Sequence, residues 1–383
     1  MRILNSMISE IEGLVLSDIH LGHSNTPTEH IVKNIQKLLL NRELLSRIKI
    51  IWLSGDVFDH GLDLNDPAVY VIRWWIVELL KVAKEYNILV EVLYGTPSHD
   101  KRQSQLFVHL NELCELGAKV RYVSELSIVY IEELDINVLY VPDRARSTNS
   151  VVWRDVKRLL ADRRLEQVDF AIMHGFFDFQ VPPVARGNTD HHIADDYCAI
   201  VKHLIFIGHH HTHNNYRHIY VPGSTDRLRH GEEEPKGILH FRVTDQHKEV
   251  KFIENKGAMK YCTFMMENET AEEAYQIIKA KIGDDRQAFV RIRAPRESPA
   301  FHIGKELANV LPNYRITFEE PKNSDKSKVG AIQSVIETAT KMNRVSLTKA
   351  NLRDELLERV KEVDPAILEL SKNLLNGVLN GTR

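Results

Sequence analysis

Short apolar runs alternate with amphipathic stretches over residues 1–255. The runs are mostly continuous stretches of valine, isoleucine and leucine, a pattern that predicts strands covered on both faces. Such strands are predicted at residues 13–18, 48–56, 88–96, 136–143, 168–175, 203–210 and 218–224. Apolar residues at helical spacing predict helices between them, for example at 69–86 and 104–116. This alternation predicts an α/β fold.

The pattern changes near residue 256, and four segments follow from it: 1–255, 256–320, 321–345 and 346–383. The second segment contains three β-rich runs separated by helical stretches, which predicts a compact α+β module. The third begins with the polar, turn-rich stretch 321–330, which predicts a linker. The last segment predicts two helices, with Asp364 and Pro365 at the start of the second. Each helix has an apolar stripe, which packs either on this chain or on a partner.

The amino-acid composition is typical of a globular protein. The chain has 383 residues, 43% of them hydrophobic and 27% charged. No apolar run approaches the ~18 residues of a membrane span, and the acidic N-terminal stretch is unlike a secretory signal. The three cysteines lie far apart and form no metal-type pair. These features favour a cytoplasmic protein without a membrane partner. The net charge of −3 gives no general basic field, although local patches and bound metal ions can outweigh it.

Carboxylates and imidazoles directly follow five of the predicted strands. The blocks contain Asp18 and His20; Asp56 and Asp59; Ser98, His99 and Asp100; His174; and His209 and His211. In an α/β fold the carboxyl ends of strands meet on one side of the sheet, so residues distant in sequence can meet there.

Aspartate and histidine without thiolate ligands suit Mn²⁺, Fe²⁺ or Zn²⁺. Two such ions roughly 3.5–4 Å apart activate water and stabilise both oxygens of an in-line displacement at phosphorus. One carboxylate must bridge the two ions, and Asp56 is our candidate. Each block alone is common at strand ends and turns, and a lone histidine such as His174 is more often structural. The five blocks together favour a metal site.

The order of these blocks resembles the calcineurin-like metallophosphoesterases. Within that superfamily, three stretches resemble the SbcD-type DNA double-strand-break repair nucleases: SDIHLGH, GDVFDHG and VPGSTDRLRHGEEEPKG. The third stretch best distinguishes these nucleases from the small phosphatases of the superfamily, which generally lack it. The resemblance spans nearly the whole chain, but the specific motifs end at Gly237. It implies a metallophosphoesterase β-sandwich flanked by helices (αββα), a small α+β DNA-capping domain at 256–320 and a C-terminal helical segment that binds an ATPase.

The resemblance also implies roles for the residues that match. One metal would be held by Asp18, His20, Asp56 and His211, and the second by Asp56, His174 and His209. His99 would be the acid-base residue beside the phosphate. The expected cofactor is two Mn²⁺ ions, with Mg²⁺, Fe²⁺ or Zn²⁺ as alternatives.

The chain departs from the family at GTPSHD, residues 95–100. The family usually has Gly-Asn-His-Asp there, and its asparagine coordinates the second metal. In this chain the loop is two residues longer and Ser98 stands in place of the amide. We therefore predict Ser98 as a weaker ligand of the second metal.

The implied function is a metal-dependent DNA exonuclease and endonuclease subunit of an SbcC–SbcD-like complex for DNA end processing, recombination and repair. Its partners would be DNA ends, an SbcC-type ABC ATPase with a coiled coil, and a second copy of the chain. It would work at the nucleoid, or in the host cytoplasm if viral. The alternatives are a phosphomonoesterase or nucleotide hydrolase of the same superfamily, and a catalytically weak DNA-end-binding subunit.

Other residues carry weaker expectations. Arg291 and Arg293 share one face of a predicted strand, and they are either solvated or in contact with phosphate. Trp74 and Trp75 are expected in the core, although one of them could serve a dimer. The histidines that flank the ligands, His23, His210 and His213, are expected to face solvent or substrate.

Overall fold

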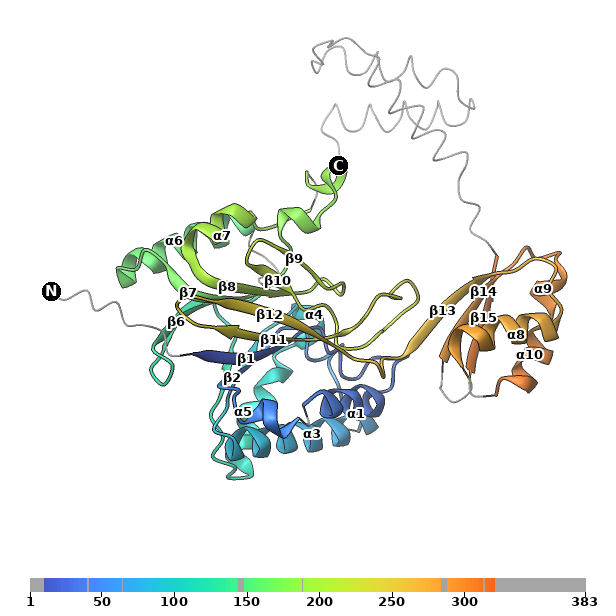
Figure 1. Cartoon of the computed structure of the whole chain (residues 1–383), viewed down its shortest axis with the longest axis horizontal. Coiled ribbons are helices and arrows are strands. Elements are labelled where there is room, and N and C mark those ends of the chain that lie inside the picture. Colours follow the sequence, from blue (N-terminus) through green and yellow to red (C-terminus); the bar gives the residue numbers. More distant parts are fainter. Residues whose placement is uncertain are drawn as a thin grey trace, which may run out of the picture. The chain divides into compact units, whose positions relative to one another are not determined.

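Two six-stranded sheets form the main body of the chain (Figure 1). The computed structural model describes residues 10–39, 41–63, 65–143, 148–187, 189–283, 288–312 and 314–320. The chain divides into two units, residues 1–320 and 321–383, and the second lies outside the described residues. The predicted linker at 321–345 and the predicted helices at 346–383 therefore belong to the part that is not described.

The first sheet has the strand order β12-β11-β1-β2-β3-β4. Its strands are β1 (Ile11–Leu16), β2 (Ile50–Ser54), β3 (Leu89–Leu93), β4 (Val120–Val123), β11 (Gly237–Val243) and β12 (Lys248–Glu254). The four strands β1 to β4 are parallel, and β11 and β12 add an antiparallel edge. Every residue of β1, β2 and β3 is buried, as the continuous apolar runs predict for strands covered on both faces.

The second sheet has the strand order β5-β6-β7-β8-β10-β9. Its strands are β5 (Ser127–Ile131), β6 (Ile136–Val141), β7 (Val168–His174), β8 (Val201–Gly208), β9 (Asn214–Tyr216) and β10 (Ile219–Val221). Strands β6, β7, β8 and β10 are parallel, and β5 and β9 are antiparallel edges.

Helices cover the outer faces of the two sheets (Figure 1). The helices of the first sheet are α1 (Thr28–Leu39), α2 (Arg42–Leu45), α3 (Pro67–Glu85), α4 (Pro97–Asp100) and α5 (Leu106–Leu113). Those of the second are α6 (Asn149–Arg163) and α7 (Ala194–Ile200). Single 3₁₀ turns lie at 103–105, between α4 and α5, and at 178–180 and 183–185, between β7 and α7. This is a helix–sheet–sheet–helix arrangement, compatible with the predicted sandwich. No described helix is long and apolar enough to span a membrane.

Apolar side chains from both sheets fill the space between them. Trp52 of β2 is fully buried there, and its ring lies 5.2 Å from Phe241 of β11 and 5.4 Å from Phe170 of β7. Two further apolar clusters lie under the helices, one against each sheet. On α3, Trp75 is 1% exposed and packs on Phe107, so it belongs to the core as expected. Its neighbour Trp74 is 47% exposed.

Residues 260–319 form a smaller module with its own core. Its elements are β13 (Lys260–Met265), α8 (Ala271–Ile282), β14 (Ala288–Arg293), α9 (Pro299–His302), α10 (Gly304–Val310) and β15 (Tyr314–Glu319). The three strands are parallel, in the order β13-β14-β15. The module has the three strands and intervening helices that the sequence predicts, and because helices join successive strands, the strands are parallel.

One charged group lies in the core between the two sheets. Glu91 of β3 is 1% exposed and accepts a hydrogen bond from the Trp52 indole at 3.1 Å. Burial raises the pKa of Glu91 to about 7, although the Arg121 guanidinium opposes that shift. The folded chain therefore binds a proton at Glu91 more tightly than the unfolded chain does. The free energy of unfolding gained from this proton is lost as pH rises toward 7.

We expect Glu91→Gln to remove this pH dependence. At pH values above the carboxyl pKa of the unfolded chain, the raised pKa of Glu91 lowers the free energy of unfolding of the wild type. The free energy of unfolding of the variant, relative to the wild type, should therefore increase between pH 5 and pH 8, by roughly 3 kcal/mol at most. Urea unfolding at both pH values, in the presence of a chelator, measures the change. The exposed Glu132→Gln is the matched control. A pH profile of Glu91→Gln parallel to that of the wild type would contradict the prediction.

Candidate metal centre

Six of the predicted ligands gather into two clusters at the carboxyl ends of four strands. The first cluster contains Asp18, His20 and His211, and the second contains Asp56, His174 and His209. Within each cluster the ligand atoms lie within 4.8 Å of one another. Both clusters combine residues from the two sheets, because β1 and β2 belong to one sheet and β7 and β8 to the other. The structure thus brings together all the predicted ligands except Ser98.

The backbone at these positions is unusual. Asp18, His20, Asp56 and His209 have φ angles of 49°, 52°, 48° and 100°. Residues other than glycine rarely adopt positive φ, and such strain of about 1–3 kcal/mol a residue clusters at functional sites. All four residues lie just after the ends of β1, β2 and β8.

A glycine is required beside the ligands, because the structure has no space there for a side chain. A Cβ atom on Gly55, which precedes Asp56, would lie 2.1 Å from Nδ1 of His174. Gly55 itself has a φ of 90°, so both its conformation and its contact require glycine. Strand β2 can therefore approach β7 closely enough for Asp56 Oδ2 to lie 3.2 Å from His174 Nε2.

In the first cluster, two carboxylates fix the orientation of the imidazoles. Nδ1 of His20 is 3.1 Å from Asp59 Oδ1, and Nδ1 of His211 is 2.8 Å from Glu232 Oε1. A neutral ring that donates from Nδ1 has a bare Nε2. The two Nε2 atoms lie 3.2 Å apart, so the space between them takes either one ring proton or a cation that both nitrogens bind. This donor set fits a divalent metal, with the carboxylate–histidine pairs that metal sites use.

In the second cluster, a backbone carbonyl has the same role. Nδ1 of His174 donates to Ser54 O at 2.8 Å, which directs Nε2 toward Asp56. Burial lowers the pKa of His174, but the Asp56 carboxylate outweighs it and raises the pKa to about 10. His174 in turn lowers the pKa of Asp56, against the opposing effect of burial. Burial and the nearby His174 lower the pKa of His209 to about 4. This cluster therefore also fits a cation.

The hydroxyl group that reaches the second cluster belongs to Thr96. Its Oγ1 lies 3.0 Å from Asp56 Oδ2, 3.3 Å from His174 Nε2 and 3.2 Å from His209 Nδ1. Ser98, which we predicted as the ligand, is exposed and makes no such contact. The reason is local: Pro97 begins the short helix α4, and its turn directs Ser98 outward.

His99, the predicted acid-base residue, lies beside the first cluster. Its ring centroid is 5.0 Å from that of His20, and its Nδ1 donates to the backbone carbonyl of Asp59. His20, Asp59 and His99 also place ligand atoms within 4.8 Å of one another. The acid-base role itself stays a prediction.

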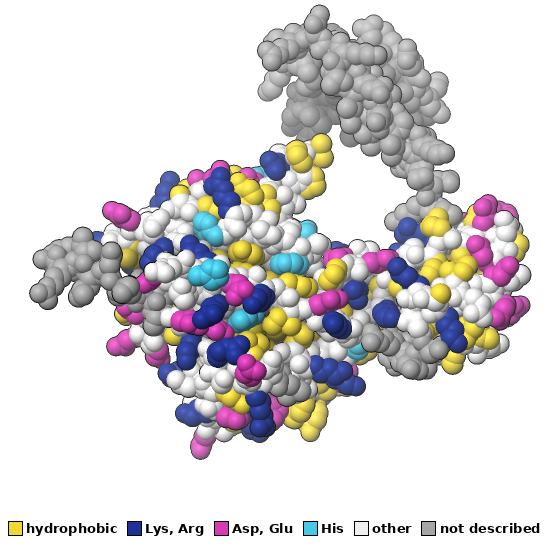
Figure 2. Space-filling model, viewed as in Figure 1, with side chains coloured by type: hydrophobic (Ala, Val, Ile, Leu, Met, Phe, Trp, Pro, Cys, Tyr) yellow, Lys and Arg dark blue, Asp and Glu magenta, His cyan; other side chains and the backbone are white. Residues whose placement is uncertain are grey.

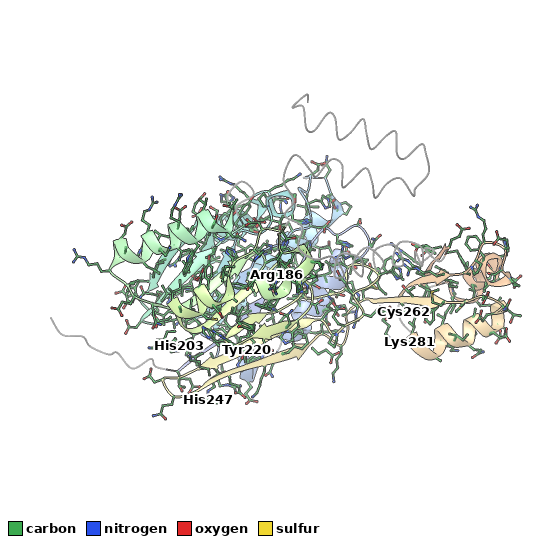
Figure 3. All side chains as sticks on the ribbon, turned by 90° about the horizontal axis from the view of Figure 1, so that it is seen from above. Arg186, His203, Tyr220, His247, Cys262 and Lys281 are labelled. Atoms are coloured by element: carbon green, nitrogen blue, oxygen red, sulfur yellow. The ribbon has the colours of Figure 1, made fainter. Side chains whose placement is uncertain are left out.

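One cavity of about 670 Å³ is lined by His99 and by members of both clusters, which are His20, His211, Asp56 and His209. Its walls include His23, His210 and His230, which belong to neither cluster, and Phe176, whose ring lies 4.4 Å from that of His209. His213 has a structural place instead, because its ring stacks on Phe252 and its Nδ1 donates to Val221 O. Histidine content alone does not define the site, since His203 and His247 lie elsewhere in the sandwich (Figure 3).

Residues 224–236 connect this cavity to the smaller module. The buried Lys236 donates to His211 O at 2.8 Å, and Glu232 holds the His211 ring. At the other end of the segment, the buried carboxylate of Asp226 accepts a hydrogen bond from Met259 N at 2.6 Å. In the sequence this stretch supports only the family resemblance, and we did not predict that Glu232 would contact a ligand.

The two arginines predicted to bind substrate contact Glu319. Arg291 Nε lies 3.1 Å and Arg293 Nε 3.5 Å from the Glu319 carboxylate. They share one face of β14, with the buried Val290 and Ile292 on the other, as predicted. Neither lines the cavity that holds the metal clusters. Figure 2 shows acidic and basic side chains interspersed over the visible face.

Comparison with known proteins assigns no family to the chain. No family model matches it, and no curated protein matches it. Among solved structures, TT1561 of Thermus thermophilus is similar at 12% identity and a TM-score of 0.39, over 64% of this chain and 99% of that chain. A second solved structure has 12% identity and a TM-score of 0.38, over 65% of this chain and 100% of that chain. Likeness at this level identifies neither a family nor an activity.

We expect Thr96→Val to weaken Mn²⁺ binding at the second cluster by about tenfold, because it removes one polar group worth about 1–1.5 kcal/mol. Calorimetric titration with Mn²⁺ measures this effect. Ser98→Ala is the matched control, and its affinity should equal that of the wild type. If Ser98→Ala instead loses affinity and Thr96→Val does not, the assignment of the hydroxyl is wrong.

We expect Glu232→Gln to lower metal affinity at the first cluster by about 10–100-fold, because the amide cannot provide the charge that orients and polarises the His211 ring. The adjacent Glu233 is exposed, so Glu233→Gln carries the same loss of charge without the contact and should bind normally. Calorimetry and the electron paramagnetic resonance spectrum of bound Mn²⁺ report the difference. Equal affinities for the two variants would remove Glu232 from the centre.

Proposed function

We propose that this chain is a metal-dependent phosphodiesterase that acts on DNA, the nuclease subunit of an SbcC–SbcD-like complex for DNA end processing, recombination and repair. The observation that carries the proposal is the pair of carboxylate–imidazole clusters that open into one cavity. Two bound divalent cations, Mn²⁺ by preference, would activate water and neutralise charge on the phosphoryl oxygens.

The side chains around the clusters support a defined division of roles. Asp56 would hold the cation of the second cluster, and its Oδ1 also accepts a hydrogen bond from Thr96 N at 2.6 Å. His99 has its Nδ1 proton held by the Asp59 carbonyl, so only Nε2 exchanges protons with a substrate in the cavity. That geometry suits a residue that transfers a proton at the leaving oxygen.

The charges of the cavity support a phosphodiester over a terminal phosphate. Of the lining residues that the structure describes, only Arg229 is a lysine or an arginine. Its side chain is largely exposed and pairs with Glu232. A diester carries one negative charge at the phosphate, whereas a monoester carries nearly two and requires more cationic groups. A phosphomonoesterase or nucleotide hydrolase is therefore the weaker candidate.

Partners belong to the same proposal. DNA ends would enter the cavity, with Arg291 and Arg293 as candidate phosphate contacts once Glu319 is displaced. The exposed aromatic side chains Tyr70 and Trp74 on α3, 80% and 47% exposed, support a homodimer through this helix. Residues 346–383 would bind the coiled coil of an SbcC-type ATPase in the cytoplasm.

We expect Asp56→Asn to abolish Mn²⁺-dependent DNA hydrolysis, because it removes a ligand charge in the second cluster. The assay follows labelled linear duplex and single-stranded DNA with Mn²⁺, with 4-nitrophenyl phosphate as the monoester comparison. The exposed Asp63→Asn is the matched control. Near wild-type DNA hydrolysis by Asp56→Asn would show that the site is misassigned. Faster turnover of the monoester than of DNA would favour the phosphatase alternative.

A further inference from the structure

His23 lies in the wall of the metal cavity on a short, firmly held loop. Its backbone N–H donates to His20 O at 3.1 Å, and the preceding Gly22 N donates to Thr28 Oγ1 at 2.9 Å. The buried Thr26 donates from Oγ1 to Arg227 O at 2.8 Å. The position of the ring relative to the first cluster is therefore fixed by the loop.

The hydrogen bonds of the ring settle which nitrogen carries the proton. Nδ1 of His23 lies 3.2 Å from Asn25 N and 3.1 Å from Thr26 N, and both of these backbone groups are donors. Nδ1 must therefore accept, and the ring proton is on Nε2. Among the hydrogen bonds of the described residues, those of this ring use Nδ1 alone, which leaves the Nε2–H group for the cavity.

His99 has the opposite tautomer in the same cavity. A carbonyl, Asp59 O, faces its Nδ1, so that nitrogen donates and Nε2 is bare in the neutral ring. The cavity thus contains one imidazole that offers an N–H group and one that offers a lone pair. A donor and a proton acceptor on the same substrate phosphate are complementary, since non-bridging oxygens only accept and a leaving or attacking oxygen exchanges a proton.

We propose that His23 is a substrate-binding residue whose Nε2–H donates a hydrogen bond to a non-bridging oxygen of the phosphate held between the metal clusters and His99. The assignment rests on the proposed phosphodiesterase function. A neutral donor suits this position, because a lysine or arginine would place a permanent positive charge beside two cation sites and weaken metal binding by like-charge repulsion.

The alternative is that His23 only caps its own loop, and one substitution separates the two roles. In His23→Asn, the side-chain oxygen takes the place of Nδ1 and can accept from the backbone N–H groups two and three residues on, as asparagine does in turns. That variant keeps the loop bonds and lacks the Nε2 donor. His23→Gln has the reverse property, because its terminal amide reaches the region of Nε2.

The test uses the full chain with two probes. Calorimetry measures the binding of inorganic phosphate to the Mn²⁺-loaded protein and needs no turnover, and bis(4-nitrophenyl) phosphate gives KM and kcat. For His23→Asn we expect phosphate affinity to fall about 10–100-fold, the effect of losing a hydrogen bond to a charged group. Mn²⁺ affinity and melting temperature should stay at wild-type values. His23→Gln should recover phosphate affinity to within about threefold of the wild type.

Two results would overturn the inference. One is wild-type phosphate affinity in His23→Asn, which would make the ring a loop cap only. The other is an equal loss of phosphate and Mn²⁺ affinity in both variants, which would mean that His23 stabilises the geometry of the first cluster and does not bind phosphate. Failure of the wild type to hydrolyse either DNA or the small diester would instead reject the proposed function, and phosphate binding would still decide the role of His23.

Discussion

The carboxylate of Asp18 joins the two sheets at the edge where the clusters form. Both of its oxygens accept from the backbone N–H of His209 at 3.0 Å. A Cβ atom on the neighbouring Gly208 would lie 2.1 Å from Ser17 Oγ and 2.2 Å from Ser54 O, so only glycine permits the approach. Each cluster takes ligands from both sheets. Neither cluster can assemble unless the carboxyl ends of β1, β2, β7 and β8 meet in this way.

The two clusters differ in the groups that accept hydrogen bonds from the Nδ1 atoms of their imidazoles. His20 and His211 are each backed by a carboxylate, from Asp59 and Glu232, which makes the rings better donors to a cation. His174 is backed by a neutral carbonyl, and the nearby oxygen of Thr96 is a hydroxyl. The first cluster therefore has the greater negative charge around it, and the physical expectation is that it fills before the second.

The predicted continuous apolar runs correspond to seven strands, namely β1, β2, β3, β6, β7, β8 and β10, and four of these, β1, β2, β7 and β8, bear ligands. The strands that the sequence prediction missed include β4 and β9, which are only four and three residues long, and β12, whose burial is partial throughout. Hydrophobicity cannot signal a strand that buries little of its surface. The ligand clusters could be predicted because their residues follow buried strands directly.

Contacts that depend on loop conformation could not be predicted in the same way. Thr96 and Ser98 are both hydroxyl residues of one loop, and only the start of α4 at Pro97 decides which of them faces the cluster. Glu232 is 21 residues from His211 along the chain, so no local pattern links the two. The positive φ angles at the ligands are likewise invisible in residue types that normally avoid them.

The close approach of His20 and His211 has a thermodynamic consequence. With 3.2 Å between their Nε2 atoms and a positive φ at His20, the folded chain holds two donor atoms together that the unfolded chain does not. A cation that binds only the folded chain stabilises it by mass action, by about 2.7 kcal/mol at a free concentration one hundred times the dissociation constant. The melting temperature of this protein is then a measure of free divalent metal in its surroundings, independent of any turnover.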